Sequence, residues 1–436
     1  MKTAYSLENL GGRWRYRDEI EKVEAAIPPG LEPLGLFQAE EPEGGDAPAL
    51  LASALAAPLG APPLRELARG RRRAAIIVSD ATRAVATAQA LPPLTDELIR
   101  AGLAWEDIFL VVAVGVHREA TGAELGEIAG GLRDRLGIFN HDPRDPEKLR
   151  PVGVTRRGTR VEVNRLAAEA DLRLAVGKVE PHEFAGYSGG RKSVLPGIAG
   201  EKTILFNHRP EMIADPLAVP GRLEGNPIHE DMLEAARLLG LDFCLNLVQN
   251  AAGRPLAAFA GGLEESHAAA VAYYERRYGL EVDSTANILL TTPGHPLNID
   301  LYQSMKPFFG LAPILKPGDV VILYSGCREG VNSDDMLKPF EYGPNLDRIM
   351  NFLLENYRIQ MDHSLLFCKL LRKGVRAIAV SPAIPGEIFS RLLMRPAASL
   401  EQALEVARDW QLAAGAIPRL GIVPAPPRLI LKSHPA

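Results

Sequence analysis

The chain has 436 residues, of which 47% are hydrophobic and 24% are charged, as in ordinary globular proteins. This composition argues against intrinsic disorder, a collagen helix or a coiled coil, and the length suggests two or three domains. Lys and Arg number 49 against 54 Asp and Glu, so the net charge is −5 and the basic excess of a general nucleic-acid binder is missing.

The cysteine content and the apolar runs indicate a cytoplasmic protein. The three cysteines lie far apart and form no CxxC pair, which argues against a disulfide scaffold or a thiolate zinc site and fits a reducing compartment. The first twenty residues are charged throughout and contain no apolar core of a signal peptide. The best apolar run, residues 108–116, has the length of a strand and not the roughly 20 residues of a membrane helix.

Residues 1–70 are rich in Pro, Ala and Gly, and we predict an extended arm that leads into a helix near residues 48–57. Beyond the arm, short apolar runs alternate with amphipathic segments, as is typical of βαβ units and a mostly parallel sheet. The predicted strands are 74–78, 108–114, 172–176 and 243–248, and the predicted helices are 88–101 and 228–239.

A second α/β block follows a helix predicted over residues 264–278 and a short polar stretch, 279–285, which we interpret as an inter-domain linker. Its predicted strands are 288–292, 320–324, 377–380 and 420–423, and its predicted helices are 301–311, 346–357, 364–373 and one that runs from a capping box at 399–402 to about residue 410.

The resulting fold class is α/β, with two α/β domains, mostly parallel sheets and an active-site cleft between the domains. We expect residues 1–280 to form an N-terminal domain that carries the cofactor and catalytic loops. Residues 285–405 would form the C-terminal domain, and residues 406–436 would return to the N-terminal one.

In open α/β sheets, ligands bind beyond the carboxyl ends of the strands, so the residues that follow each strand are candidates. Asp80, Thr82 and Arg83 form a DxTR turn after the first strand, where an Arg fork suits a phosphate or carboxylate. The same turn also suits a helix cap with a surface arginine. After the second strand, His117 follows a Gly-Val pair and is placed for acid–base chemistry near neutral pH, although a lone histidine is more often structural.

The most informative segment, residues 177–192, reads GKVEPHEFAGYSGGRK and contains His182 and Lys192. Because glycine permits positive φ, we expect the backbone N–H groups of the turn Ser188-Gly189-Gly190 to converge on an anion beside Lys192. The segment is not a Walker A motif, since GxxxxGK[ST] is absent.

These motifs resemble the nickel-dependent lactate racemase family, the 2-hydroxyacid racemases and epimerases that use a nickel-pincer nucleotide. The DxTR turn, a GxHR turn, the EPHxxAGYSGGRKxxxPG block and a later histidine occur in the family's order. Residues 226–231 and 302–306 extend the match, which spans about residues 80–306 and continues more loosely toward the C-terminus. The EPH…SGGRK block is highly specific, whereas DxTR alone is not.

The resemblance implies a role for each matching residue. Lys192 would carry the covalently attached cofactor, a nickel-bound pyridinium-3-thioamide-5-thiocarboxylic acid mononucleotide, and His208 would complete a square-planar Ni(II) site. His117 and His182 would be the catalytic acid–base pair. Further cofactor contacts would come from Asp80, Thr82, Ser188, Gly189 and Gly190, and substrate contacts from Arg83, Tyr302, Gln303 and Lys306.

The chemistry of a 2-hydroxy acid explains why two histidines would be needed. Its α-hydrogen is barely acidic beside a carboxylate, so removal as hydride, which leaves a planar 2-keto acid, is the easier route. One histidine then accepts the hydroxyl proton, and a second histidine on the opposite face returns a proton. We therefore predict an isomerase, a racemase or epimerase of a 2-hydroxy acid. Val114 and Val116 stand where the family often has hydroxyl residues, so lactate itself is not assumed as the substrate.

Two other functions stay open. A zinc- or iron-dependent hydrolase or dehydratase would use His117, His182 and His208 as a metal triad. A non-catalytic binder of a nucleotide or sugar acid would leave Lys192 unmodified. Mass spectrometry of Lys192 and elemental analysis separate these alternatives from the racemase.

The expected partners are small molecules and maturation proteins. The resemblance implies a 2-hydroxy acid substrate and cofactor biosynthesis proteins, and we expect no nucleic acid and no membrane; a homo-oligomer stays open. We expect Arg83, Lys192 and Lys306 to converge at the cleft between the domains. His295 and His363 of the second block are expected to be structural or solvated.

Overall fold

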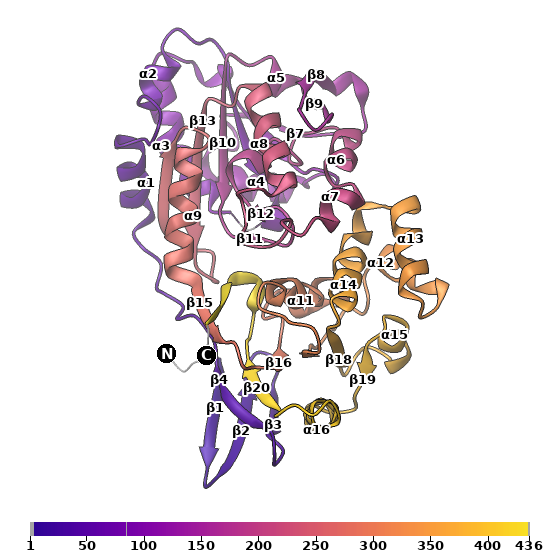
Figure 1. Ribbon diagram of the computed structural model, residues 1–436. Helices are drawn as coiled ribbons and strands as arrows, with labels where there is room; N and C mark the ends of the chain where they lie inside the picture. Colours follow the sequence, from indigo (N-terminus) through magenta and orange to yellow (C-terminus); the bar gives the residue numbers. More distant parts are fainter. Residues whose placement is uncertain (1–3, 84, 435–436) are drawn as a thin grey trace. The chain divides into compact units, whose positions relative to one another are not determined.

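The computed structural model describes residues 4–83 and 85–434 and divides into two compact units (Figure 1). The central unit comprises residues 40–209 and 222–277. The terminal unit contains the chain up to Ala39, the short segment Pro210–Gly221 and the chain from Tyr278 onward. Both units combine helices with mostly parallel strands, so the predicted α/β class is confirmed.

The central unit is built on a six-stranded sheet of order β14-β13-β10-β5-β6-β7, in which only β14 is antiparallel. Its strands are rich in Val, Ile, Leu and Ala because a parallel sheet is covered on both faces. The bounds are β5 (Ala74–Ser79), β6 (Ile108–Ala113), β7 (Gly137–Asn140), β10 (Leu172–Lys178), β13 (Phe243–Gln249) and β14 (Pro255–Gly261).

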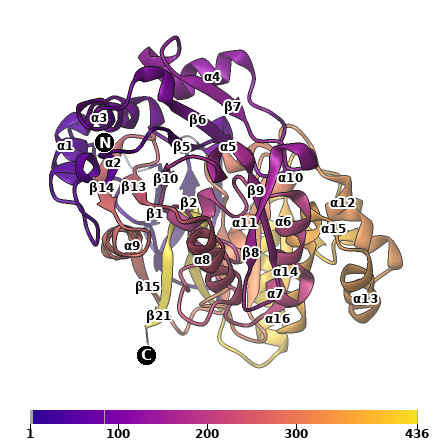
Figure 2. The same cartoon turned by 90° about the horizontal axis from the view of Figure 1, so that it is seen from above.

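Helices cover this sheet, and α1, α2 and α3 lie together on one side of it (Figures 1 and 2). Helix α3 buries a stripe of leucines, including Leu91, Leu94 and Leu98, against the core. The bounds are α1 (Ala47–Ala56), α2 (Leu64–Ala68), α3 (Thr87–Arg100), α4 (Gly122–Ala129), α5 (Arg165–Ala168), α6 (Glu201–Asn207), α8 (Pro227–Leu239) and α9 (Glu265–Tyr278). Two hairpins, β8 (Leu149–Val154) with β9 (Arg160–Asn164) and β11 (Pro181–His182) with β12 (Gly186–Tyr187), complete the unit.

The strand order reverses direction between β5 and β10. From β5 the chain proceeds outward through β6 to β7, and it then returns to the other side of β5 to form β10 and β13. The loops that follow the carboxyl ends of two such strands run in opposite directions. A crevice forms between these loops, and it is the usual ligand site of an open α/β sheet. The DxTR turn follows β5 and the SGGRK segment follows β10, so both predicted motifs lie at this switch point.

The terminal unit has a second six-stranded sheet, all parallel, of order β19-β18-β17-β16-β20-β4. Its strands are β4 (Glu32–Leu36), β16 (Ile288–Thr291), β17 (Val320–Tyr324), β18 (Arg376–Val380), β19 (Arg395–Pro396) and β20 (Arg419–Ile422). Its helices are α7 (Pro210–Ala214), α10 (Leu301–Ser304), α11 (Lys306–Leu311), α12 (Asp334–Leu337), α13 (Leu346–Asn356), α14 (Asp362–Arg372), α15 (Gly386–Arg391) and α16 (Leu400–Ala413).

The N-terminal segment differs from the predicted extended arm. It forms a three-stranded antiparallel sheet of β1 (Tyr5–Leu10), β2 (Arg13–Asp18) and β3 (Val23–Ala26), and then contributes β4 to the second sheet (Figure 1). Apolar residues of this segment, such as Tyr16 and Leu31, are buried in the core of the terminal unit. A Gly-Gly pair between alternating runs is a hairpin signal, and it stands at 11–12.

The C-terminal segment and the predicted linker also differ from expectation. We expect residues 406–436 to join the N-terminal domain, but β20 pairs with β16 and β4 inside the second sheet, where Leu420 and Ile422 are fully buried. The predicted linker instead contains β15 (Gly279–Asp283), which pairs in parallel with β21 (Ile430–His434). Among the described residues, every helix is too short or too polar to cross a lipid bilayer.

Candidate active site

His117 is held by a buried carboxylate at the carboxyl ends of β5 and β6. These strands are parallel neighbours, with Ser79 opposite Ala113, so the residues that follow them lie close together. Asp80 Oδ2 lies 2.8 Å from His117 Nδ1, and the Asp80 side chain is 5% exposed whereas that of His117 is 44% exposed. The carboxylate therefore accepts the Nδ1–H bond, and Nε2 of the ring is left as the nitrogen that can take up a proton.

This contact gives Asp80 a role that sequence reasoning missed. We predicted Asp80 as a cofactor contact, yet its carboxylate is the group that orients His117. Arg83, predicted to bind substrate, is exposed at the end of the 3₁₀ turn Ala81–Arg83, and its amide donates to the Asp80 carbonyl at 3.3 Å. The side chain of Thr82 lies outside the described part of the structure.

Three of the predicted residues surround the ring of Phe184, which lies between β11 and β12 and is 3% exposed. The ring centroids of His182 and His208 lie 4.7 and 5.1 Å from that of Phe184, both edge to face. The Lys192 amine lies over the same ring at 6.0 Å. The predicted acid–base residue, tether and metal ligand, spread over 27 positions in sequence, are thus gathered around one phenyl ring.

His182 has two neighbours at Nδ1, in contrast to the single carboxylate beside His117. The Ala185 amide donates to Nδ1 at 3.4 Å, and Glu183 Oε2 lies 3.4 Å from the same nitrogen. The first contact suits a neutral ring that carries its proton on Nε2, and the second suits a ring protonated on Nδ1. Both side chains are largely buried.

The glycine turn does not present its amides as we predicted. The amide of Ser188 donates to the Glu180 carbonyl at 2.9 Å, and the amide of Gly190 donates to Asn246 Oδ1 at 3.0 Å. These two N–H groups therefore have acceptors within the protein and do not converge on an anion. Glycine at position 189 instead allows the backbone of the turn to lie close to Asn246. Gly189 has φ +79°, and a Cβ there would lie 2.9 Å from Asn246 Oδ1.

Arg191, which sequence reasoning left without a role, organises this turn from inside. Its guanidinium is 1% exposed and donates to the carbonyls of Ala185 and Tyr187 at 2.9 and 2.7 Å. It also lies 2.7 Å from His267 Nε2. Burial lowers the pKa of Arg191 to about 9. The loop that ends at Lys192 is therefore folded around a buried cation.

His208 caps the C-terminal end of α6 and is 7% exposed. Burial, and secondarily the charge of Lys192, lowers the pKa of His208 to about 3, so the ring is neutral. Its Nδ1 has no hydrogen-bond partner among the described residues. A neutral imidazole with an unpaired nitrogen is the form that binds a metal ion. The preceding Asn207 is fixed by Asp231, whose Oδ2 accepts its amide at 2.7 Å.

The alternative of a protein-only metal triad finds no support in this arrangement. Across residues 4–83 and 85–434, no group of three His, Cys, Asp or Glu side chains is placed to hold a metal ion. His117 is engaged by Asp80 instead of approaching a shared metal position.

Tyr302, Gln303 and Lys306 belong to the terminal unit, where they follow β16. We predicted one helix over 301–311, but the structure breaks it into α10 and α11 because Pro307 stands in the first turn of α11. Asp300 caps α10, since its Oδ1 accepts the amide of Gln303 at 2.7 Å. The side chains of Tyr302, Gln303 and Lys306 are partly buried.

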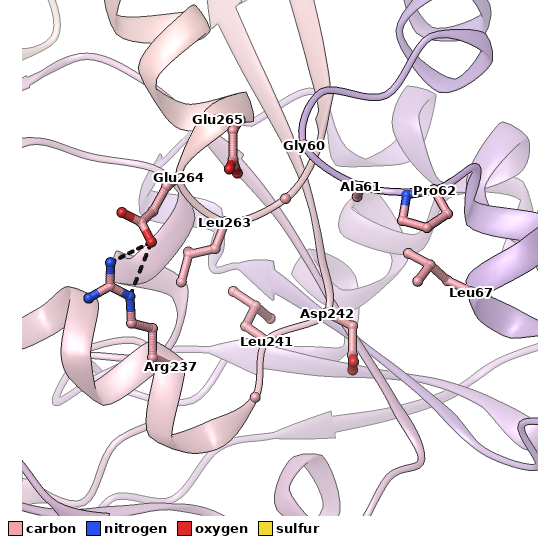
Figure 3. Close-up of a pocket in the computed structure, with 12 residues that line it drawn as sticks. Gly60, Ala61, Pro62, Leu67, Arg237, Leu241, Asp242, Leu263, Glu264 and Glu265 are labelled. Carbon is pink, nitrogen blue, oxygen red and sulfur yellow. Dashed lines mark hydrogen bonds and ion pairs between the residues drawn. The ribbon is translucent and has the colours of Figure 1, made fainter.

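A cavity of about 410 Å³ lies elsewhere in the central unit, near the amino end of β13 (Figure 3). Asp242 and Glu265 contribute to its wall, and Arg237 and Glu264 pair with each other at its edge. The candidate residues follow the carboxyl ends of β5, β6 and β10, so this cavity belongs to the opposite edge of the sheet.

The geometry defines an α/β protein that places two histidines, a lysine and a buried imidazole with an unpaired nitrogen on the loops after the carboxyl ends of its central strands. Residues 21–221 match the model of the lactate racemase N-terminal domain, and residues 282–424 match that of the lactate racemase C-terminal domain. The lactate racemase of Thermoanaerobacterium thermosaccharolyticum is 33% identical over 360 residues, which cover 82% of this chain and 84% of that protein. The lactate racemase of Lactiplantibacillus plantarum is 32% identical over 366 residues, with 82% and 85% covered.

Solved structures agree with these matches. The lactate racemase apoprotein from Thermoanaerobacterium thermosaccharolyticum superposes with a TM-score of 0.85 at 30% identity, over 94% of this chain and 97% of that one. A Thermotoga maritima protein, 17% identical, shares the fold with a TM-score of 0.63, over 91% and 100% of the two chains. The chain belongs to the lactate racemase family, and it is an isomerase of that family.

Proposed function

We propose that this protein racemises or epimerises a 2-hydroxy acid, with His117 and His182 as the acid–base pair. The observation that carries the proposal is the gathering of His182, Lys192 and His208 around Phe184, next to a switch point where Asp80 orients His117. Family membership and the names of the two curated relatives support the same reaction class.

The residues fit the nickel-pincer nucleotide that the sequence motifs imply. Lys192 would hold it covalently. The ring of His208, whose Nδ1 has no hydrogen-bond partner among the described residues, would supply the protein ligand to nickel. When bound, this group supplies an electrophilic carbon that accepts the α-hydrogen of the substrate as hydride. A single buried, neutral imidazole is compatible with a site in which the cofactor provides the other ligands.

The histidines would then move the hydroxyl proton. Nε2 of His117 takes it from one enantiomer, because Asp80 keeps the Nδ1–H bond and stabilises the imidazolium that forms. When the hydride is given back to the opposite face of the planar 2-keto acid, His182 would donate a proton to the carbonyl oxygen, and the Ala185 amide at Nδ1 favours a proton on Nε2 of this ring. Reversal of the two roles converts the opposite enantiomer.

The primary test measures both the covalent modification of Lys192 and the conversion of 2-hydroxy acids. The protein is co-expressed with the cofactor-making proteins, its intact mass is measured, and the adduct is mapped by peptide analysis. Enantiopure lactate, larger aliphatic and aromatic 2-hydroxy acids, malate and sugar acids are then assayed by chiral chromatography. We expect a mass increase on Lys192, stoichiometric nickel, and conversion of at least one acid.

The matched control is a second lysine ten residues away. Lys192→Met should lose both the adduct and the conversion, whereas Lys202→Met, at an exposed position of α6, should keep both. Conversion by the Lys192→Met protein, or an adduct that maps elsewhere, contradicts the proposed tether. An active protein that contains zinc and no adduct would favour the hydrolase or dehydratase alternative.

A further inference from the structure

Two consecutive residues at the start of α14 hold Tyr302 at three points. The imidazole of His363 stacks on the phenol ring, with centroids 4.0 Å apart and ring planes 10° apart. Its Nδ1 donates to the backbone carbonyl of Tyr302 at 2.9 Å. The Tyr302 hydroxyl donates to Asp362 Oδ1 at 3.3 Å. Ring face, carbonyl and hydroxyl of one tyrosine are thus contacted from one helix end.

The position of His363 is tightly determined. The side chain is 2% exposed, and the ring of Phe309 packs against it edge to face at 5.0 Å. A buried imidazole N–H needs an acceptor, so the bond to the Tyr302 carbonyl fixes the tilt of the ring on which the phenol stacks. We expected His363 to be structural or solvated, and it is buried beneath a predicted substrate-binding residue.

The backbone around Tyr302 is fixed from other sides as well. Asp300 Oδ2 accepts a hydrogen bond from Asn332 at 2.8 Å, and the hydroxyl of Ser304 bonds to that of Ser325 at 2.8 Å. These contacts hold the two ends of α10. His363 and Asp362 contact the Tyr302 side chain itself, one at the ring face and the other at the hydroxyl.

We propose that His363 and Asp362 are positioning residues that set the orientation of Tyr302 for substrate binding. The inference rests on the proposed function and on the contact with the 2-hydroxy acid that the sequence motifs imply for Tyr302. Because Tyr302 would contact substrate in the ground state and in the transition state alike, a misplaced ring weakens substrate binding more than it slows the chemical step. The expected signature is a rise in KM at nearly constant kcat.

The test is a double-mutant cycle on the cofactor-loaded enzyme. His363→Phe keeps a stacking ring and removes the donor, and we expect KM to rise about tenfold, the effect of one lost hydrogen bond, while kcat changes less than threefold. In a Tyr302→Ala background the same substitution should leave KM unchanged, since the residue acts only through Tyr302. Additive effects in the cycle overturn the proposal.

Two further variants keep the result interpretable. His363→Asn retains a short donor without the ring, so its KM should rise less than that of His363→Phe. If His363→Phe fails to fold, Asp362→Ala replaces it in the cycle. Phe367→Leu is the control, because Phe367 lies on the same helix and packs on Phe308 at 5.0 Å. It should lower the melting temperature and leave KM unchanged; a matching rise in KM would mean that loosened helix packing, and not Tyr302, causes the effect.

The outcome for the proposed function is read separately. A wild-type protein without the Lys192 adduct and without conversion refutes the racemase. A wild-type protein that converts substrate, with KM unaffected by His363→Phe and Asp362→Ala, refutes the positioning role alone.

Discussion

The loops after β6 and after β10 each carry one proposed acid–base histidine, and they hold it in different ways. His117 has a side chain that is 44% exposed and one strong partner, the buried carboxylate of Asp80 at 2.8 Å. His182 is mostly buried, packs on Phe184 and has two weaker neighbours at Nδ1. One ring is oriented by a charge and the other by packing.

Because the two rings are held differently, different substitutions should affect His117 and His182. Removal of a carboxylate should disable the exposed histidine, because little else fixes its ring. The buried histidine should tolerate loss of its carboxylate and be sensitive to the loop around it, which is folded on Arg191.

The largest effect is expected when either ring is removed. His117→Ala and His182→Ala should each lower kcat by roughly 10²- to 10⁴-fold, the usual contribution of a general acid or base. Chiral chromatography of a converted 2-hydroxy acid gives kcat, and intact mass should show that both variants keep the Lys192 adduct. Full activity in either variant would refute the two-histidine scheme.

The second prediction concerns the loop that follows β10, ends at Lys192 and is folded around Arg191. Arg191→Met removes the charged donor that bonds to the buried carbonyls of Ala185 and Tyr187, and we expect the unfolding free energy to fall by about 3 kcal/mol. Denaturant unfolding measures the change. The control is Arg144→Met, an exposed arginine that pairs with Glu201 at 2.9 Å and should cost less than about 1 kcal/mol. Equal losses in the two variants would show that the buried cation does not support the loop.

The third prediction compares the loss of the carboxylate beside His117 with the loss of the carboxylate beside His182. Asp80→Asn should lower kcat roughly tenfold to a hundredfold, because a hydrogen bond to a charged group contributes about 1.5–3 kcal/mol. Glu183→Gln should have a smaller effect, since His182 keeps its contacts with Phe184 and Ala185. Steady-state kinetics on both variants tests the order, and a larger loss in Glu183→Gln would reverse the comparison.

The smallest expected effect is a pH dependence of stability near Arg191. Burial, followed by the charges of Arg191 and Arg237, lowers the pKa of His229 to about 3. The unfolded chain binds this proton below about pH 6.5 and the folded protein does not, so the unfolding free energy should fall as the pH drops from 6.5 toward 3. The slope for this group is at most about 1.4 kcal/mol per pH unit.

The measurement compares wild type with His229→Gln in denaturant at pH 7 and pH 5. The stability of the variant should fall less between the two pH values, because it lacks the buried neutral imidazole. An identical fall in both proteins would contradict the lowered pKa.

Much of the fold followed from local pattern. The runs that became β5, β6, β10 and β13 are short and rich in Val, Ile, Leu and Ala, and they are bounded by turn residues. The break between α10 and α11 was missed, although Pro307 disfavours the continuation of a helix begun at Leu301. The N-terminal hairpin was missed although Gly11 and Gly12 mark its turn, since a proline-rich composition was given more weight than alternation.

The site was harder to predict because its decisive contacts join distant segments. Asp80 and His117 stand 37 positions apart, and only the parallel register of β5 and β6 brings them together. The Gly190 amide is satisfied by Asn246, 56 positions later, so no local reading of SGG could reveal that it is already occupied. Motif spacing indicates which residues matter, whereas long-range packing decides what each contacts.

The parallel pairing of β4 with β20 has a consequence for synthesis. The terminal unit assembles one sheet from residues 32–36 and residues 419–422, whereas the central unit is complete once residue 277 has been made. During translation the first strands must therefore wait, with the β4 edge unpaired, while the whole central unit emerges and can fold. The growing chain therefore carries an incomplete terminal unit until residue 422 has been made, and the unpaired β4 edge is where transient association with other chains is most to be expected.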